Sequence, residues 1–366
     1  MKKRVFYAAT QRFEAARQIE SLSAEHPARR LHGHGFRANI RTELADTWAP
    51  FAGAETSALA SLLNESLEPL DYQLLNECVP CPTDENLAYW LKTKLAQLPG
   101  LDTVGIQSTE NQGATLTADG DCHVWRTFRF EAAHQLPNVP PGHQCGRMHG
   151  HGFDVTIHVR TIGGETNGQE LAYDALDAVW KPLQSELHLS CLNDIPGLDN
   201  PTSELLAVWL WQRIQPRLPQ LSWITVNETS TAGCHYDGHQ CRIWKQFQFE
   251  SAMRLTRAPE LDARRRLHGH SYTARLHLTA PLDEVLGWVQ DYGDVKEIFA
   301  PTLEQLDHHF LNDTPGLNDA DISSLLGWIH SMSAPGLPQL DRIDLFESQG
   351  CGGLLTWGGQ RPALPS

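Results

Sequence analysis

Three histidines and one cysteine are grouped near the middle of this 366-residue chain. His134 ends the sequence Phe-Glu-Ala-Ala-His, and eleven residues later the chain reads Cys145-Gly-Arg-Met-His149-Gly-His151. Side chains two apart on a β-strand point to the same face, so His149 and His151 can act together, with His134 on a neighbouring strand as a third nitrogen ligand. Three protein ligands with one open position are typical of catalytic zinc. Of the transition metals that imidazole binds, we expect Zn²⁺.

Cys145 lies in a glycine-containing turn four residues before His149. A thiol beside a divalent cation tends towards the thiolate, which is a usable base or nucleophile at neutral pH. The alternatives are a fourth metal ligand or a small buried apolar side chain. We favour the base. The chain has two other His-Gly-His sequences, at 32–34 and 268–270, and neither is accompanied by such a cysteine. If the cysteine only closed a structural metal site, there would be no reason for those two copies to lack that site.

Two further groups of residues can take part in acid–base chemistry or binding. Asp307 and His308 are adjacent, and an aspartate can orient an imidazole and raise its basicity, although such a pair also occurs as an ion pair at a helix end. A glutamate stands near the end of each predicted last strand, at Glu110, Glu228 and Glu347. A carboxylate can accept two parallel hydrogen bonds from an amino-pyrimidinone edge, although a lone glutamate there is usually only solvated.

The chain consists of three copies of one unit. Phe-Glu-Ala-Ala or Phe-Glu-Ser-Ala begins at Phe13, Phe130 and Phe249, at intervals of 117 and 119 residues, and the His-Gly-His sequences repeat at the same intervals. Turn-forming residues near 118 and 238 mark the boundaries. The predicted units are 1–118, 119–238 and 239–366, called the first, second and third unit below; each is of ordinary domain size.

The second unit predicts an antiparallel sheet with two helices on one face. Alternating apolar residues predict strands, and a threonine or serine at 202–203 is placed to cap the second helix. The predicted order of elements is strand, strand, helix, helix, strand, over Val124–Glu131, Phe153–Arg160, Tyr173–Leu187, a helix ending near Ile214, and Trp223–Glu228. The fold class is therefore α+β.

Composition argues against several classes of function. The net charge of −15 makes a nucleic-acid-binding surface improbable. No apolar run approaches the length of a membrane span, and the basic N-terminus is not followed by a signal-peptide core, so we expect a cytoplasmic protein without a membrane partner. Eight scattered cysteines fit reduced thiols better than a disulfide framework.

The second unit closely resembles the 6-pyruvoyltetrahydropterin synthase / 6-carboxytetrahydropterin synthase family. The third unit resembles the family less closely, and the first unit resembles it least. The motif sequences of the second unit are most similar to those of the bacterial 6-carboxytetrahydropterin synthase of queuosine biosynthesis. The matching stretches are Phe130-Glu-Ala-Ala-His-Gln-Leu-Pro, Gly142-His-Gln-Cys-Gly-Arg-Met-His-Gly-His, Leu192-Asn-Asp-Ile-Pro-Gly-Leu, Asn200-Pro-Thr-Ser-Glu and Asn227-Glu-Thr-Ser-Thr-Ala-Gly-Cys.

The resemblance implies a tunnelling fold (T-fold), in which small units assemble edge to edge into a barrel with pterin sites between neighbours. Here three units in one chain would close a pseudo-trimeric barrel, which also removes exposed sheet edges. The family's two-layered assemblies imply a homodimer of such rings. The roles carried over by resemblance are zinc ligands for His134, His149 and His151; base for Cys145; proton relay from an adjacent unit for Asp307 and His308; and pterin binding for Glu228, with Thr202 nearby.

The catalytic residues are divided between units, which predicts one composite site and two degenerate ones. His134 is matched by Arg17 in the first unit and Met253 in the third, and Cys145 is matched by Ala28 and Arg264. Arginine is not a plausible zinc ligand, and methionine fills the space with an apolar group. We therefore expect the two other interfaces to be free of metal.

The predicted function is that of a zinc-dependent carbon–carbon lyase acting on a small pterin. By resemblance it converts 7,8-dihydroneopterin triphosphate to 6-carboxy-5,6,7,8-tetrahydropterin, with release of acetaldehyde and triphosphate. Two alternatives remain open at this point: a 6-pyruvoyltetrahydropterin synthase, which begins from the same substrate, and a non-catalytic pterin-binding protein.

Overall fold

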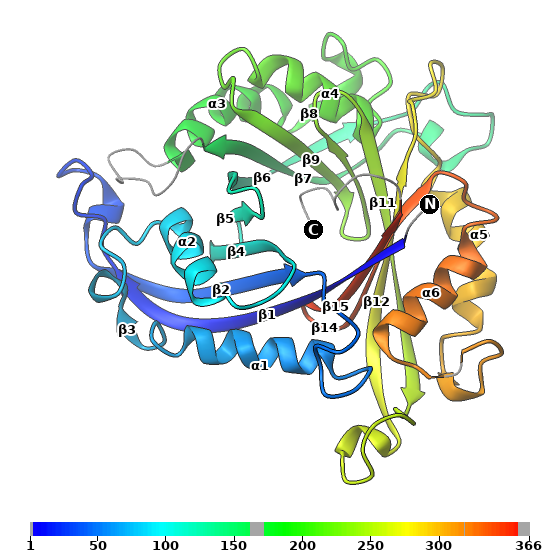
Figure 1. The fold of residues 1–366 in the computed structure, drawn as a ribbon. Helices are drawn as coiled ribbons and strands as arrows, with labels where there is room; N and C mark the ends of the chain where they lie inside the picture. Colours follow the sequence, from blue (N-terminus) through cyan, green and yellow to red (C-terminus); the bar gives the residue numbers. More distant parts are fainter. Residues whose placement is uncertain (1–2, 162–171, 318, 358–366) are drawn as a thin grey trace.

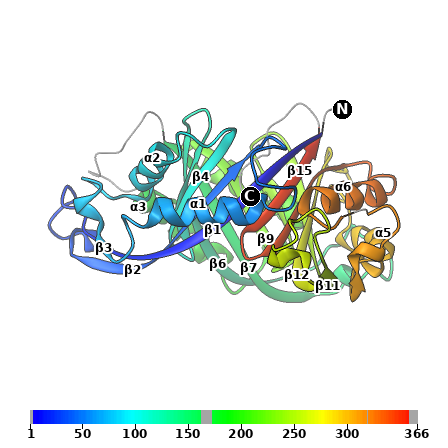
Figure 2. The same cartoon turned by 60° about the horizontal axis from the view of Figure 1, so that its bottom comes forward.

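The described residues of the computed structural model are 3–161, 172–317 and 319–357, and they form a closed barrel of twelve long antiparallel strands (Figure 1). The strand order is β10-β9-β7-β6-β5-β4-β2-β1-β15-β14-β12-β11, and β11 pairs with β10 to close the ring. The α-helices lie outside the ring of strands (Figure 2). The predicted T-fold repeats and the pseudo-trimeric barrel are confirmed, and closure leaves no long unpaired edge in the ring.

One series of elements occurs three times along the chain. The first unit contains β1 (Lys3–Arg17), β2 (His32–Thr42), α1 (Glu55–Leu67), the short β3 (Gln73–Leu74), α2 (Asp84–Lys94), β4 (Leu101–Thr109) and β5 (Gln112–Thr117). The second contains β6 (Cys122–His134), β7 (His149–Thr161), α3 (Ala172–Leu187), the short β8 (Ser190–Cys191), α4 (Ser203–Ile214), β9 (Leu221–Thr229) and β10 (Ala232–Tyr236). The third contains β11 (Cys241–Met253), β12 (His268–Thr279), α5 (Tyr292–Glu304), the short β13 (His309–Phe310), α6 (Ile322–Ser333), β14 (Leu340–Ser348) and β15 (Cys351–Trp357).

Each unit has one more long strand than the sequence predicts. The additional strands β5, β10 and β15 are the last elements of their units, and each pairs with the first strand of the next unit around the ring. β10 is only five residues long and almost wholly buried, so it lacks the alternation of apolar and polar residues that reveals a half-buried strand. The missed strands are therefore the ones that join the units.

The predicted unit limits remain a prediction, since the units share one sheet. Positions 118 and 238 fall in the short turns between β5 and β6 and between β10 and β11. Main-chain pairing continues across both turns. The units are therefore covalently and structurally continuous, and a side chain of one unit can line a cavity with side chains of the next.

An aromatic pair occupies the same core position in every unit. Cross-strand neighbours stack with ring centroids 4.9 to 5.0 Å apart, between the first two strands of the unit. These pairs are Phe13–Phe36, Phe130–Phe153 and Phe249–Tyr272. Because side chains alternate along a strand, burying these rings on the helix-covered side turns their neighbours towards the barrel interior. No helix of the described residues is long and apolar enough to span a membrane.

Candidate metal centre and adjoining cavity

The pairing of β6 with β7 brings the three predicted metal ligands together. His134 lies directly opposite His149 in the strand register, and His151 follows two residues later on the same face. One nitrogen from each of the three rings lies within 4.8 Å of the others, and the Nε2 atoms of His134 and His151 are 3.2 Å apart. Among the described residues, no other group of three or more potential ligands is this close.

Backbone carbonyl groups select the ring tautomer that leaves Nε2 free. A carbonyl oxygen can only accept a hydrogen bond, so each Nδ1 that contacts one carries the proton, and the Nε2 lone pair remains for a metal. The three contacts are His134 Nδ1 to Pro201 O at 3.2 Å, His149 Nδ1 to Arg147 O at 2.8 Å, and His151 Nδ1 to Gly152 O at 3.1 Å. Burial, with the neighbouring His149, lowers the pKa of His134 to about 4, which keeps that ring neutral. Three imidazoles whose unprotonated nitrogens converge fit Zn²⁺.

A cavity of about 180 Å³ adjoins this group, between the second and third units. Both Cys145 and Glu228 line it. The other polar or aromatic lining residues are His143, Gln144, Thr202, Ser203, Glu204 and Thr229 from the second unit, and Lys245, Trp288, Gln290, Asp291 and Tyr292 from the third. The predicted thiol and the predicted anchoring carboxylate are therefore brought together beside the three histidines.

The surroundings of Cys145 alone do not produce a thiolate. Burial raises the pKa of the Cys145 thiol to about 11, and the negative charges of Glu228 and Asp291 raise it further. The thiol of the protein without a cation is therefore protonated at neutral pH. A divalent cation on the neighbouring imidazoles would lower this pKa, so the proposed base depends on the metal.

A β-bulge directs Glu228 into the cavity. In the pairing of β9 with β10, Asn227 pairs with Gly233 and Thr229 pairs with Ala232, so Glu228 has no partner in the ladder. A bulge changes the direction of the side chain it carries. Glu228 Oε1 lies 3.9 Å from His151 Nε2, and burial raises the pKa of the Glu228 carboxyl while His151 and His149 oppose this shift. No described residue hydrogen-bonds this carboxyl group, which leaves it available to a ligand.

Thr202 and Glu204 hold the third unit against the second. The Thr202 hydroxyl accepts a hydrogen bond from Leu205 N at 3.1 Å, as predicted for a helix cap, and donates one to Gly287 O at 2.7 Å. Glu204 accepts a hydrogen bond from Val289 N at 2.9 Å, and burial raises its pKa to about 7. Thr202 therefore lines the cavity, but its hydroxyl group is already engaged with backbone.

Sequence reasoning missed part of the cavity wall. Glu204 and the segment from Trp288 to Tyr292 were not among the predicted site residues, although Glu204 ends the Asn200-Pro-Thr-Ser-Glu stretch named in the sequence analysis. His143, also missed, contacts Asp291 across the interface at 2.8 Å. These residues can be read in the sequence, but only the fold shows that they line the cavity.

Asp307 and His308 are not brought to Cys145 within one chain, and neither lines the cavity. α5 begins beside the cavity, and its 13 residues carry the chain about 20 Å away before Asp307 is reached. There Asp307 Oδ1 accepts a hydrogen bond from Glu250 N at 2.9 Å and lies 3.0 Å from His308 Nδ1. The His308 side chain is 78 % exposed. The expectation that neighbouring units of one chain complete the composite site is therefore corrected, because the pair sits at the outer rim of its own unit.

The interface between the third and first units retains a cavity of similar size, about 180 Å³. Glu347 occupies the same bulge position in β14 as Glu228 in β9, and its carboxylate accepts a hydrogen bond from the Thr56 hydroxyl at 2.6 Å. Met253 takes the place of the third histidine and accepts a hydrogen bond from Tyr272. This cavity keeps the carboxylate but lacks the three-nitrogen group.

The interface between the first and second units is filled by an ion pair. Arg17 Nη1 contacts Asp84 Oδ1 at 2.7 Å, with both side chains buried, and Asp84 Oδ2 accepts hydrogen bonds from Ser108 and Tyr173. The strand register shows that Ser108, rather than Glu110, is the bulge residue in β4. The interpretation of Glu110 as the third equivalent glutamate was therefore wrong, since it rested on a place near the strand end, and the bulge lies two residues earlier.

Replacing Arg17 by methionine should destabilise the protein. Removing one partner leaves the buried Asp84 carboxylate uncompensated, and such losses amount to about 3–5 kcal/mol. Urea unfolding of Arg17→Met and of the control Arg12→Met, which alters an exposed arginine of the same strand, would measure this. Equal unfolding midpoints for the two variants would show that the buried Arg17–Asp84 ion pair does not stabilise the protein.

Comparisons with known proteins agree with this architecture. The family model described as 6-pyruvoyl tetrahydropterin synthase matches three times, at residues 7–120, 123–239 and 242–355. A curated relative, the 6-carboxy-5,6,7,8-tetrahydropterin synthase of Synechocystis sp., is 37 % identical over 120 residues, which are 31 % of this chain and 91 % of the relative.

Two solved structures resemble the chain weakly. The 6-pyruvoyl tetrahydropterin synthase of Caenorhabditis elegans has a TM-score of 0.29 and 16 % identity, over 32 % of this chain and 95 % of that one. A uricase from Bacillus fastidious has a TM-score of 0.31 and 10 % identity, over 73 % and 92 % of the two chains. The three matches to the family model cover nearly the whole chain, and the chain therefore belongs to the 6-pyruvoyl tetrahydropterin synthase family.

Proposed function

We propose that this chain is a zinc-dependent lyase that converts 7,8-dihydroneopterin triphosphate to 6-carboxy-5,6,7,8-tetrahydropterin, acetaldehyde and triphosphate. One observation carries the proposal: three converging imidazole nitrogens adjoin a cavity that holds both the Cys145 thiol and the carboxyl group of Glu228, which no described residue hydrogen-bonds. The curated relative named 6-carboxy-5,6,7,8-tetrahydropterin synthase supports the carboxy product over the pyruvoyl one. By the resemblance given in the sequence analysis, the product would enter queuosine biosynthesis.

The proposed roles follow from the positions of the groups. The Glu228 carboxylate accepts two hydrogen bonds from the amino-pyrimidinone edge of the pterin and so fixes the orientation of the ring. Cys145 Sγ takes a proton from a carbon of the substrate side chain. Zinc, when held by His134, His149 and His151, supplies a Lewis acid beside the side-chain oxygens. The segment from Trp288 to Tyr292 closes the cavity and excludes water from the reacting groups.

We further propose a homodimer in which two barrels meet at the rim that carries His308. Tyr72 and Leu189 occupy the positions equivalent to His308; all three have positive φ angles, and the two apolar side chains are about 80 % exposed. The adjacent equivalent positions Leu31, Met148 and Leu267 are also exposed, and Leu267 lines the same open hollow as His308. Large apolar side chains gathered on one rim indicate an interaction surface.

The proposed dimer would supply the missing proton relay. Met148 lies on this rim and only three residues from Cys145. A second barrel on the rim can therefore bring the partner's His308, with the partner's Asp307, towards the thiol of this chain. Two composite sites would form in each dimer, one for each set of three histidines.

Mixing two inactive variants should restore activity if the relay comes from a partner. A chain with His308→Ala keeps Cys145, and a chain with Cys145→Ala keeps His308, so a mixed dimer contains one intact site of two. After unfolding and refolding together, random pairing predicts roughly a quarter of the wild-type activity. Activity no higher than that of the separate variants would show that the two groups do not meet across a dimer.

The product of the reaction tests the proposed function. Zinc-loaded protein incubated with 7,8-dihydroneopterin triphosphate should give a 6-carboxy pterin by mass spectrometry, together with one equivalent of acetaldehyde. A 6-pyruvoyl product without acetaldehyde would assign the sister activity instead. Unchanged substrate in the presence of bound zinc would favour a pterin-binding protein.

A further inference from the structure

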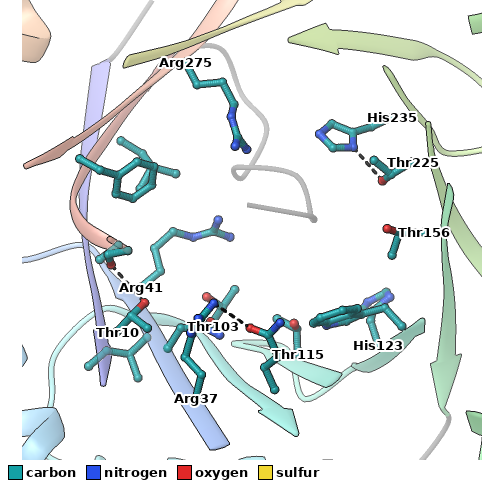
Figure 3. A pocket seen from close by; sticks show the side chains of 18 of the residues that line it. Thr10, Arg37, Arg41, Thr103, Thr115, His123, Thr156, Thr225, His235 and Arg275 are labelled. Atoms are coloured by element: carbon teal, nitrogen blue, oxygen red, sulfur yellow. Dashed lines mark hydrogen bonds between the residues drawn. The ribbon is translucent and has the colours of Figure 1, made fainter. Parts of the chain in front are cut away.

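A cavity of about 440 Å³ lies inside the barrel, and its volume is within the range of small-molecule sites, roughly 300–1,000 Å³ (Figure 3). All three units contribute inward-facing side chains to its wall. Its titratable lining residues are Arg37, Arg41 and Arg275, with His123, His158 and His235. No aspartate or glutamate is among the described residues that line it. All titratable residues of the lining are therefore basic, although the net charge of the whole chain is −15.

Two of the arginines have no carboxylate partner among the described residues. Arg37 Nη1 donates to Gln107 Oε1 at 3.3 Å, and Arg275 Nη2 donates to Gln246 Oε1 at 3.2 Å. The Arg275 guanidinium also lies over the Trp244 ring, 4.4 Å from its centroid, and its buried Nε has no hydrogen-bond partner. Amide oxygens and an aromatic face satisfy donors without neutralising the charge.

The carboxylates near the cavity already have partners, and one of these partners is Arg41 itself. Asp102 accepts a hydrogen bond from Arg41 at 2.7 Å, while Asp344 contacts Arg342 at 2.6 Å and His277 at 3.0 Å. Burial lowers the pKa of Arg275. The negative charge of Asp344 opposes this shift, and the positive charge of Arg342 adds to it. The barrel interior therefore holds an excess of positive charge that nothing described in the wall balances.

We propose that the interior cavity binds a phosphate-type oxyanion between Arg37, Arg41 and Arg275. The guanidinium groups of Arg41, from β2, and of Arg275, from β12, both project towards the middle of the cavity (Figure 3). Planar guanidinium groups bind phosphate oxygens through paired hydrogen bonds, which suits several arginines around one anion. The site is separate from the zinc group, since none of the three arginines lines the cavity that holds Cys145.

Hydroxyl groups add neutral donors around the same space. Threonines from five strands line it, namely Thr10, Thr103, Thr115, Thr156 and Thr225. Thr225 contacts His235 Nδ1 at 2.9 Å, and burial keeps the pKa of His235 well below its usual value. Because His235 is neutral, it gives a hydrogen-bonding group without adding charge, and the arginines carry the attraction for the anion.

Thermal unfolding in sodium phosphate and in sodium chloride of equal ionic strength tests this proposal. Phosphate above its dissociation constant should raise the midpoint by about 2 °C for each tenfold increase in concentration. The double variant Arg37→Gln, Arg275→Gln should lose this dependence. The control Arg266→Gln, which removes an exposed arginine outside the barrel, should keep it. Equal midpoints of the wild-type protein in phosphate and chloride, or equal stabilisation by acetate, would overturn the proposal.

A crystal soaked in selenate gives a second measurement that does not require the variants to fold. Anomalous density within hydrogen-bonding distance of Arg41 and Arg275 is expected. Density only on the outer surface would overturn the proposal. Because the zinc group and Cys145 are not involved, neither result depends on the proposed catalytic function.

Discussion

Replacing Cys145 by alanine should lower kcat by about 10²- to 10⁴-fold, the range typical for loss of a general base. The zinc content should stay unchanged, since the three histidine nitrogens converge without help from the thiol. Steady-state kinetics and metal analysis of the same preparation would measure both quantities. Loss of zinc together with activity would identify the cysteine as a fourth ligand instead of a base.

A matched cysteine variant separates this effect from general loss of a thiol. Cys78 is also partly exposed, lies in the first unit, and does not line the cavity. Cys78→Ala should therefore keep wild-type kcat. If Cys145→Ala retained near-normal turnover, the assignment of the base would be wrong.

Replacing His149 by alanine should remove zinc and lower activity by about 10³-fold or more, because a bound Lewis acid contributes several kcal/mol to the barrier. The third unit offers a close control. His268 occupies the same strand position, and its Nδ1 contacts the Arg266 carbonyl at 2.8 Å, as His149 Nδ1 contacts Arg147. His268→Ala should keep both zinc and activity, since Met253 stands where a third ligand would be needed. Equal losses of zinc and activity in the two variants would show that the histidines of the third unit bind zinc as those of the second unit do.

Much of the architecture is predictable from the sequence because the chain contains three tandem copies of one unit. The repeated Phe-Glu-Ala-Ala sequence predicts the period, and the His-Gly-His spacing predicts which histidines share a strand face. Both inferences depend only on local geometry, in which side chains alternate along a strand. The convergence of His134 with His149 required only that their strands be neighbours, and the register places them opposite each other.

Other parts of the site depend on long-range packing, which local patterns do not encode. Glu110 looked equivalent to Glu228 by its place near a strand end, whereas the bulge register puts Ser108 there. Asp307 looked available to Cys145 because their units are neighbours, yet the length and direction of α5 carry it to the outer rim. The basic interior could not be predicted from local patterns, because its arginines and histidines lie on five strands of three units and meet only when the ring closes.

The proposed function requires that one interface of three binds a catalytic metal ion. The most direct measurement is the zinc content of purified wild-type protein after saturation with zinc and removal of loosely bound metal. We expect one zinc ion per chain, held by His134, His149 and His151. A value near three per chain would contradict it, because the first and third units would then bind metal despite Arg17 and Met253.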